Sequence, residues 1–317
     1  MVFPNASDRP QFILLFLDGV GLGDPHPHNP LAQPEHAPFL SQLLGSPLVA
    51  PLVVEQPTLL AKPIDACLGV PGLPQSATGQ TTLYTGMNAA KFRGQHQSAF
   101  ANGSLRSLIE THNLFRQVMA LGGTATLANL YSPAYFEAIA QRRLRYAVGT
   151  LVNLTARLPF RMQSEYERGQ AIFWDITGQW AAARGVAAPP IAPREAGVRL
   201  AHLGAGHTFT LFECFLTDYA GHRQHWTTAV EAFRQVDQFV ENIVENLSAN
   251  VTLVITSDHG NLEDLSTSKH TLNPVPLIAI GPSAHSFSTA QDLTDIASTI
   301  TDILKTFESL KKRDFHG

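Results

Sequence analysis

Residues 12–23 read FILLFLDGVGLG, an unbroken apolar run that stops at Asp18 and opens into a glycine-rich loop. Three more apolar runs of similar length are bounded by Gly, Pro or polar loops: Phe209–Thr217, Val251–Ser257 and Val275–Ile280. Short continuous apolar runs rich in β-branched and aromatic residues are typical of strands buried on both faces, as in parallel sheets. We therefore expect four buried parallel strands.

Helical patterns lie between and after these runs. Apolar residues at a spacing of three to four predict a helix over about Gln224–Leu247. A second helix is predicted over about Asp292–Leu310, where Asp292 followed by Asp295 forms a plausible capping arrangement at its start. Alternating strands and helices predict an α/β fold, a doubly wound and mostly parallel sheet sandwiched by helices.

The region from residue 130 to residue 199 has a different composition, with aromatic and Arg-rich stretches. We expect a helix near Phe173–Arg184 and a linker over Ala188–Pro193. Residues 130–199 are therefore predicted to form a small inserted cap, and residues 1–129 and 200–317 the core. The cap is locally basic, which fits either solvated helix faces or a clamp for an anionic substrate. Its charged residues include Arg142, Arg143, Arg145, Arg157, Arg161 and Arg168 against Glu165 and Glu167.

The overall composition limits the classes of function. The chain has 317 residues, 44% of them hydrophobic, and a net charge of −4, so its overall charge does not favour binding to nucleic acid or to an anionic membrane. The apolar run before Asp18 is too short for a membrane span or a signal peptide, and no cleavage pattern follows it. We expect a soluble, cytoplasmic protein.

Three of the predicted strands end in an aspartate: Asp18, Asp218 and Asp258. The carboxyl ends of parallel strands meet at one edge of a sheet, where the active sites of such folds gather. Carboxylates roughly 4–6 Å apart repel each other and raise each other's pKa, and a cation would relieve that repulsion. The pattern therefore favours a metal site.

Histidines accompany these carboxylates. His222 follows Asp218 by four residues, His259 is adjacent to Asp258, and His270 precedes the run Val275–Ile280. Any one of these histidines taken alone would more often be an ordinary surface or core residue. A set of carboxylate oxygens and imidazole nitrogens without thiolate suits Mn²⁺ or Zn²⁺.

A possible nucleophile lies in residues 72–82, GLPQSATGQTT. Ser76 is predicted to cap a helix that runs toward Tyr84, and by itself an ordinary N-cap would explain it. Next to metal ions, a serine at this position is well placed to react with a phosphate group. The reason is that a helix N-terminus presents N–H groups and a partial positive charge to phosphate oxygens. A coordinated hydroxyl also loses its proton more readily.

Taken together, these segments resemble the alkaline phosphatase superfamily, and most of all its branch of cofactor-independent phosphoglycerate mutase and phosphopentomutase. The similar motifs are DGVGLG (18–23), SATG (76–79), Asp218 with His222, DHGN (258–261) and HTLNPVP (270–276). They follow the order of that family from residue 18 to residue 276. The resemblance covers the core and does not extend to the cap.

The resemblance implies two divalent metal ions, Mn²⁺ or alternatively Zn²⁺. One would be held by Asp218, His222 and His270. The other would be held by Asp18, Asp258 and His259, with Ser76 bridging to the substrate. The sequence departs from the mutases at Gln80, where they usually have His.

The implied activity is phosphoryl transfer on a small phosphorylated substrate through a phosphoserine at Ser76. A mutase must hold its intermediate away from water, and the predicted cap is smaller than those of the mutases, so we expect a phosphomonoester hydrolase. A phosphomutase is the alternative, and a phosphodiesterase a more remote one. Candidate substrate contacts are Lys91, Arg93 and His96 after the nucleophile helix, and Arg142, Arg143 and Arg145 in the cap. The sequence does not predict the oligomeric state.

Other enzyme classes fit less well. A sulfatase would need Pro and Arg at the positions of Thr78 and Gln80. In the loop GVGLG the third Gly comes one residue early for a dinucleotide-binding loop, and Asp18 would face a pyrophosphate. A serine hydrolase using Ser76 lacks the G-x-S-x-G elbow. A non-catalytic metal-binding relative is disfavoured because every expected ligand and the nucleophile are present.

Overall fold

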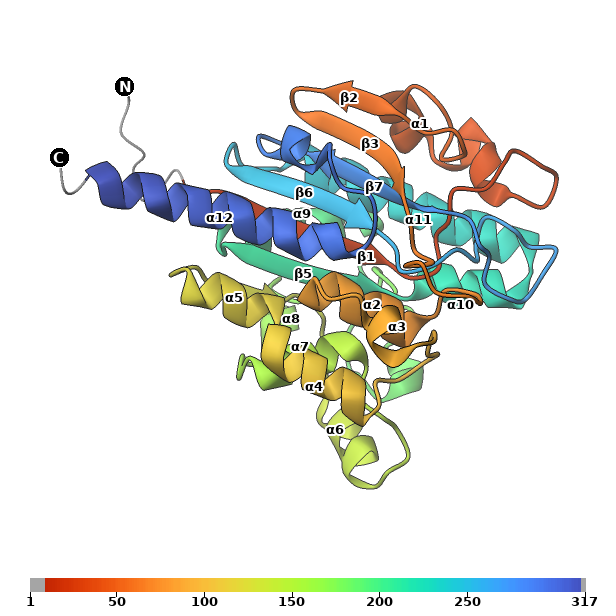
Figure 1. The fold of residues 1–317 in the computed structure, drawn as a ribbon. Helices are drawn as coiled ribbons and strands as arrows, with labels where there is room; N and C mark the ends of the chain where they lie inside the picture. The colour runs from red at the N-terminus through yellow and green to blue at the C-terminus, as the bar shows by residue number, and fades with distance from the viewer. Residues whose placement is uncertain (1–8, 315–317) are drawn as a thin grey trace.

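The computed structural model describes residues 9–314 and is built on one mixed sheet (Figure 1). Its seven strands lie in the order β2-β3-β7-β6-β1-β5-β4. Their bounds are β1 Gln11–Leu17, β2 Val54–Gln56, β3 Leu59–Ile64, β4 Ala125–Leu127, β5 Phe209–Cys214, β6 Val251–Thr256 and β7 Val275–Ile280. The predicted α/β fold with one central sheet is therefore confirmed, although the sheet is mixed and not mostly parallel.

Strand β1 lies between β5 and β6 and is parallel to both, as expected for the first three apolar runs. The prediction that Val275–Ile280 is also parallel is wrong, because β7 pairs antiparallel with β6 and with β3. A parallel return requires a long crossover, usually a helix, and no helix separates β6 from β7. The run Phe209–Thr217 is also longer than its strand, since β5 ends at Cys214.

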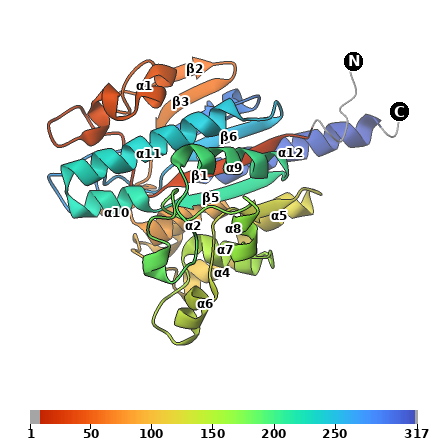
Figure 2. The same ribbon diagram turned by 180° about the vertical axis from the view of Figure 1, so that it is seen from behind.

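Helices cover both faces of the sheet, as the two opposite views show (Figures 1 and 2). One layer contains α1 Pro38–Leu44, α9 Pro193–Ala205, α10 Leu216–Arg223 and α11 Trp226–Glu245; the other contains α2 Ser76–Thr85, α4 Gly103–His112, α5 Leu114–Ala120, α7 Val148–Thr155 and α12 Thr294–Asp314. Side chains of β1 alternate between the two layers, so that Phe12 packs with the second and Ile13 with the first. A strand that is apolar on both faces must be covered on both.

The remaining helices are short: α3 Ala89–Arg93, α6 Pro133–Ala140, α8 Gln163–Glu167, and the 3-10 turns η2 Pro30–Ala32, η3 Pro34–His36, η4 Ala182–Arg184 and η5 Ala284–Phe287. The two long predicted helices correspond to α11 and α12. The expected cap of α12 is confirmed. Asp292 Oδ1 accepts a hydrogen bond from the N–H of Thr294 at 2.8 Å, and Asp295 Oδ2 accepts one from the N–H of Asp292 at 3.2 Å.

Residues 130–199 contain a small hydrophobic cluster of their own. It consists of Leu130, Tyr166, Ala171, Phe173, Ala181, Val186 and Ala188. We propose that this region is an inserted cap, whose helix α7 packs against the main core through Val148, Leu151 and Val152. The expected boundary at residue 199 falls inside α9.

The helix predicted over Phe173–Arg184 is not formed, and only the turn η4 lies within it. The Asp175 carboxylate accepts hydrogen bonds from the N–H groups of Gly178 at 2.5 Å and Trp180 at 2.7 Å. Ile176 and Gly178 have φ angles of 70° and 77°. An Asp side chain that binds nearby backbone groups competes with helix formation, and these left-handed residues interrupt a right-handed helix.

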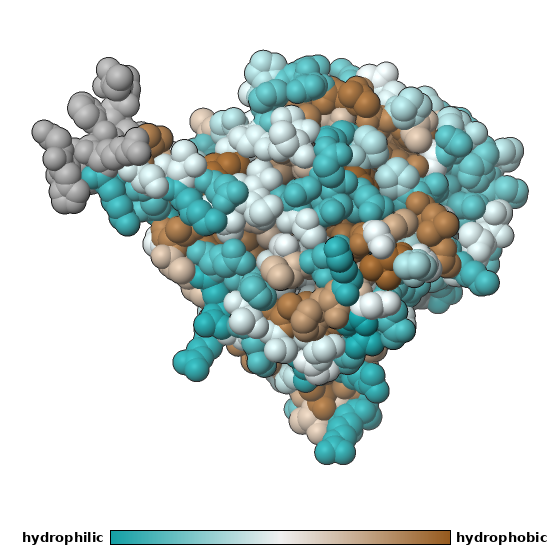
Figure 3. Space-filling model, viewed as in Figure 1, coloured by the Kyte–Doolittle hydropathy of each residue, from teal (hydrophilic) through white to brown (hydrophobic). Residues whose placement is uncertain are grey.

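The surface in the view of Figure 3 mixes hydrophilic and hydrophobic residues, and its apolar side chains lie in several separate groups. Phe92 of α3 is among the exposed large hydrophobic residues. None of the helices within residues 9–314 has both the length and the apolar character needed to cross a bilayer.

Candidate metal centre

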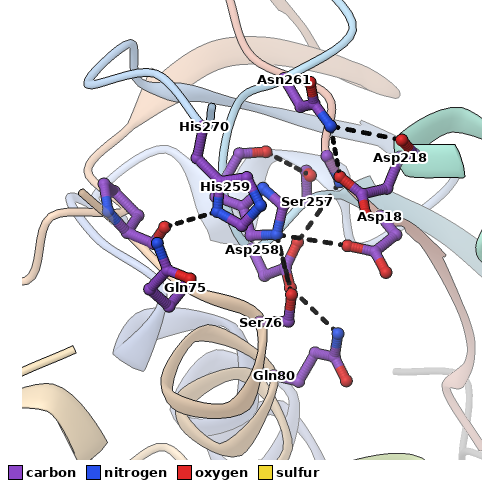
Figure 4. A network of polar contacts seen from close by, with 12 residues as sticks. Asp18, Gln75, Ser76, Gln80, Asp218, Ser257, Asp258, His259, Asn261 and His270 are labelled. Carbon is purple, nitrogen blue, oxygen red and sulfur yellow. Dashed lines mark hydrogen bonds and ion pairs between the residues drawn. The ribbon is translucent and has the colours of Figure 1, made fainter. Parts of the chain in front are cut away.

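The carboxyl ends of β1, β5 and β6 bring the predicted side chains together (Figure 4). Asp18 follows β1 directly and Asp258 is the second residue after β6, whereas Asp218 lies in the first turn of α10, four residues beyond β5. The loop after β1 approaches α10 closely because residue 19 is glycine. A Cβ on Gly19 would lie 2.6 Å from Asp218 Oδ1, and its φ of +68° also favours glycine.

Two overlapping groups of side chains are close enough to share a metal ion. The first is Asp218, His222 and His270, and the second is Asp18, Asp218 and His259; in each group the ligand atoms lie within 4.8 Å of one another. Asp218 belongs to both groups. The two predicted sites are therefore neighbours, and the metal-binding role of each residue stays a prediction.

Distances define how tightly these groups are packed. His222 Nε2 lies 3.3 Å from Asp218 Oδ2, and His259 Nε2 lies 3.4 Å from Asp18 Oδ1. Asp258, expected in the second site, is fully buried with Oδ2 3.6 Å from His259 Nε2. All six predicted aspartates and histidines thus lie in one cluster.

The hydrogen bonds of the three histidines indicate which ring nitrogen faces the cluster. The Nδ1 atoms of His222, His259 and His270 lie 2.9, 3.3 and 2.8 Å from the backbone oxygens of Ser268, Gly260 and Pro74. A carbonyl oxygen only accepts, so Nδ1 carries a hydrogen in each ring and Nε2 of the neutral ring has a free lone pair. Metal-ligating histidines show this arrangement, in which an outer carbonyl fixes the ring.

The aspartates repel one another in a buried setting. Burial raises the pKa of Asp18 well above its usual range, and the charges of Asp258 and Asp218 add to the rise. Burial likewise raises the pKa of Asp258 to about 7; a hydrogen bond from Gln80 opposes this, and the charge of Asp218 adds to it. For Asp218, burial is outweighed by the hydrogen bond from His222 and by His259 and Asn261, so its pKa falls to about 2.

The same cluster keeps two imidazoles neutral. Burial lowers the pKa of His259, and burial together with the neighbouring His259 lowers the pKa of His270. Their rings stack with centroids 3.6 Å apart. Asp18 Oδ1 is buried and has no hydrogen-bond partner within the described residues. Acceptor oxygens and imidazole lone pairs that face each other without donors fit a divalent cation.

Further residues orient this set and were not assigned a role from the sequence. Gln80 donates through Nε2 to Asp258 Oδ2 at 3.0 Å, and Asn261 donates through Nδ2 to Asp218 Oδ1 at 2.6 Å. The buried carboxylate of Glu263 accepts from the N–H groups of Gly21 and Asn261 at 2.9 and 2.8 Å. One signal for Gln80 is its position four residues after Ser76, which places both on one helix face.

Ser76 is the first residue of α2 and not its N-cap, which is Gln75. The prediction of a capping serine is wrong in this respect, because the Ser76 Oγ atom lies 3.0 Å from His259 Nε2 instead of binding the helix backbone. Helix α2 approaches the loop after β6 so closely that a Cβ on Gly79 would lie 2.7 Å from that of Asp258. The predicted nucleophile therefore lies at the edge of the cluster.

The predicted contacts after α2 lie near the nucleophile helix, with different surroundings. Arg93 donates to Ser104 Oγ at 3.1 Å, and His96 Nε2 lies 3.2 Å from the backbone oxygen of Val70. Next to His96, the N–H of Gln97 donates to Thr78 Oγ1 at 3.2 Å. Lys91 is exposed on α3. Their roles in substrate binding stay predictions.

The cap arginines divide into two groups. Arg143 and Arg145 line a cavity of about 480 Å³ in the cap, whereas the exposed Arg142 is not among its lining residues. Arg161 and Arg168 already have partners, since Arg161 donates to Thr126 Oγ1 in β4 at 2.9 Å and Arg168 pairs with Glu165 at 2.6 Å. Only part of the basic region is thus directed at an open cavity.

One part of this chain matches a protein-family model. A model of the metalloenzyme superfamily matches residues 200–307. That segment includes five of the clustered residues, namely Asp218, His222, Asp258, His259 and His270. Asp18 and Ser76 lie outside it.

Curated relatives match over a similar length. The 2,3-bisphosphoglycerate-independent phosphoglycerate mutase of Halobacterium salinarum is 35% identical over 96 residues, which are 27% of this chain and 19% of that protein. The enzyme of the same name from Antithamnion sp. is 37% identical over 100 residues, again 27% and 19%. The chain therefore covers about a fifth of the length of these relatives.

Solved structures resemble the whole chain in fold. A cold-active alkaline phosphatase from Shewanella sp. aligns with a TM-score of 0.53 and 16% identity, over 93% of this chain and 99% of that one. The PH0037 protein from Pyrococcus horikoshii aligns with a TM-score of 0.55 and 14% identity, over 94% and 97%. At such low identity the likeness is one of fold.

Proposed function

The chain belongs to the metalloenzyme (alkaline phosphatase) superfamily and is related over a C-terminal part to phosphoglycerate mutases, and we propose that it is a phosphomonoester hydrolase with Ser76 as nucleophile. The observation that carries the proposal is the position of the Ser76 hydroxyl. It lies 3.0 Å from His259 Nε2, which is itself 3.4 Å from Asp18 Oδ1. A serine at the edge of a cation-type cluster is the arrangement that serine-based phosphoryl transfer requires.

Two divalent cations would be held by the clustered side chains, one by Asp218, His222 and His270 and the other by Asp18, Asp258 and His259. Carboxylate and imidazole donors favour Mn²⁺, with Zn²⁺ as the alternative. When bound, such ions neutralise phosphate charge and make a nearby hydroxyl or water easier to deprotonate.

In the proposed reaction the Ser76 hydroxyl gives its proton to solvent water, and its oxygen attacks phosphorus. The bond from phosphorus to the substrate oxygen breaks, and the departing alkoxide takes up a proton. The N-terminus of α2 contributes a partial positive charge next to the phosphate oxygens. Water then attacks the phosphoserine, which releases phosphate and restores the hydroxyl.

Solvent access favours water over a second substrate hydroxyl as the acceptor. The His222 side chain is 43% exposed, so that one end of the cluster is open to solvent. A mutase must exclude water from its intermediate. Phosphomutase activity is the second candidate, and the names of the curated relatives favour it.

The test uses the full chain, stripped of metal and reloaded with Mn²⁺ or Zn²⁺. A panel of phosphomonoesters that includes 3-phosphoglycerate is scored for free phosphate and for isomerised product. Release of phosphate supports the hydrolase, isomerisation alone supports the mutase, and activity that resists complete metal removal contradicts both.

Ser76→Ala should lower turnover on the order of 10³-fold or more, because no other group takes the phosphoryl group. Metal content, measured by mass spectrometry, should stay near that of the wild type because the six other ligands remain. Ser107→Ala on the exposed side of α4 is the matched control. Undiminished turnover in Ser76→Ala would exclude the nucleophilic role.

A further inference from the structure

The cap contains a cavity of about 480 Å³ that the proposed phosphoryl chemistry does not use. Its wall is mainly aromatic and aliphatic. The aromatic lining residues are Phe100, Tyr131, Tyr135, Phe173, Trp174 and Phe215. Cavities of 300–1,000 Å³ with apolar walls and a few polar groups are typical of sites for small organic molecules.

The charged residues of the cavity are unbalanced. Arg143, Arg145 and Arg184 line it, against a single acidic residue, Glu137. Within residues 9–314 none of the three arginines forms an ion pair or a side-chain hydrogen bond, and Arg184 only lies over the Trp174 ring at 5.8 Å. Guanidinium groups that lack a carboxylate partner beside an apolar cavity are suited to bind an anionic group of a ligand.

Two tyrosines are among the uncharged polar residues that line the cavity, which also include Asn129, Ser132 and Thr150. The hydroxyls of Tyr131 and Tyr135 lie 2.8 and 3.3 Å from Thr150 Oγ1. These contacts hold the phenol rings in place, with Tyr131 and Tyr135 at a centroid distance of 5.3 Å. Fixed aromatic rings offer faces and edges on which a flat ligand ring can pack.

Two parts of the cavity wall are connected to the metal centre. Phe215, three residues before Asp218, donates its N–H to the backbone oxygen of Trp174 at 3.2 Å. Phe100 lies on the loop whose Gln97 is hydrogen-bonded to Thr78, two residues after Ser76. Phe215, the N-cap of α10, thus lines the cavity itself, and the loop that carries Phe100 is hydrogen-bonded to the nucleophile helix.

We propose that this cavity binds the organic part of the substrate, and that this part is an aromatic ring bearing a second anionic group. The inference rests on the proposed function and specifies its substrate class. The ring would pack against Tyr135 and Trp174, and the anion would pair with the unpartnered arginines. A three-carbon phosphoglycerate would leave most of such an aromatic cavity unfilled.

The test compares three substrates whose leaving groups are all primary alcohols: ethyl phosphate, benzyl phosphate and 4-carboxybenzyl phosphate. Similar leaving groups keep the intrinsic reactivity comparable, so differences in kcat/KM report binding of the organic part. We expect kcat/KM to rise from ethyl to benzyl to 4-carboxybenzyl phosphate, by about tenfold or more at the last step. Equal values for the three would overturn the inference and leave the hydrolase intact.

The variant Arg145→Met/Arg184→Met removes two charges while keeping an unbranched apolar stem at both positions. It should lower kcat/KM for 4-carboxybenzyl phosphate by about 10–100-fold, because the carboxylate loses charged hydrogen-bond donors, and leave benzyl phosphate within about threefold. Arg157→Met, an exposed cap arginine outside the cavity lining, is the matched control. An equal loss on all three substrates would contradict a contact with the carboxylate.

A binding measurement separates the two proposals. Calorimetry with the Mn²⁺-loaded protein compares 4-carboxybenzylphosphonate with ethylphosphonate, neither of which can be hydrolysed. Selective binding of the former that the double variant abolishes would support the cavity inference even if no phosphomonoester is turned over. Absence of selective binding would overturn it.

Discussion

The metal centre and the cap cavity handle charge in opposite ways. In the metal centre most of the ionisable side chains are held by a hydrogen-bonding neighbour, as Asp258 is by Gln80 and Asp218 by Asn261. In the cap cavity Arg143 and Arg145 have no partner within the described chain. A fixed set of donors suits chemistry that tolerates little displacement, whereas free arginines on a surface adapt to the ligand. We infer that the first region carries the reaction and the second the choice of substrate.

The largest effect is expected when a buried side chain of the metal centre is removed. His259→Ala should lose one metal ion and lower activity on the order of 10³-fold or more, because His259 is fully buried and contacts both Ser76 and Asp18. Metal analysis and phosphate release measure the two effects. His202→Ala, on an exposed position of α9, is the control. If the His259→Ala variant kept its full metal content and normal turnover, the metal centre would not be the region that carries the reaction.

The next prediction concerns how the stability of the protein depends on pH. Burial raises the pKa of Glu213 in β5 to about 7, against which the hydrogen bond from Tyr84 acts. The pKa of Glu213 is thus higher in the folded protein than in the unfolded chain, so the neutral carboxyl group contributes to stability. This contribution is complete at pH values below 4.5, the pKa of the group in the unfolded chain. That contribution declines as the pH rises and is lost once the pH has passed about 7, a change of about 3 kcal/mol.

Glu213→Gln, which cannot ionise, should therefore gain stability relative to the wild type between pH 5 and pH 8. Urea unfolding at both pH values measures the difference in the free energy of unfolding. The measurement is made without added Mn²⁺, since the charge of Asp258, one of the clustered carboxylates, contributes to the raised pKa of Glu213. A difference between variant and wild type that is the same at both pH values would show that Glu213 ionises normally.

The smallest expected effect concerns the residues that orient the ligands. Gln80→Leu removes the 3.0 Å hydrogen bond to Asp258, and we expect metal affinity or activity to fall about 10–100-fold, as for other outer partners of metal ligands. Metal titration of the stripped protein measures the affinity. Gln238→Leu, exposed on α11, is the control. An unchanged affinity and rate would mean that Asp258 is held without its amide partner.

Much of the centre was predictable because it is encoded locally. An apolar run followed by aspartate marks a buried strand and its carboxyl end, and so Asp18 and Asp258 were placed correctly at one sheet edge. The direction of β7 was not predictable from its own residues. Parallel and antiparallel strands buried on both faces have the same apolar pattern, and only the connection distinguishes them.

The failed helix near Phe173 has a similar cause. The sequence predicted a helix there, but the Asp175 side chain accepts hydrogen bonds from nearby N–H groups and forms a turn instead. Residues that orient the ligands, such as Gln80, were recognised in the sequence only as a departure from relatives. Their role depends on which carboxylate they meet across the sheet.

By itself, the sequence determined the chemical inventory: which carboxylates and imidazoles follow strands, and which serine begins a helix beside them. The tertiary structure alone decided that Asp218 is shared by both ligand groups, that Ser76 turns toward His259, and that three arginines surround an aromatic cavity. The reason is physical. Periodicity and strand ends are properties of neighbouring residues, whereas distances between segments 200 residues apart are set by how the two helical layers pack on the sheet.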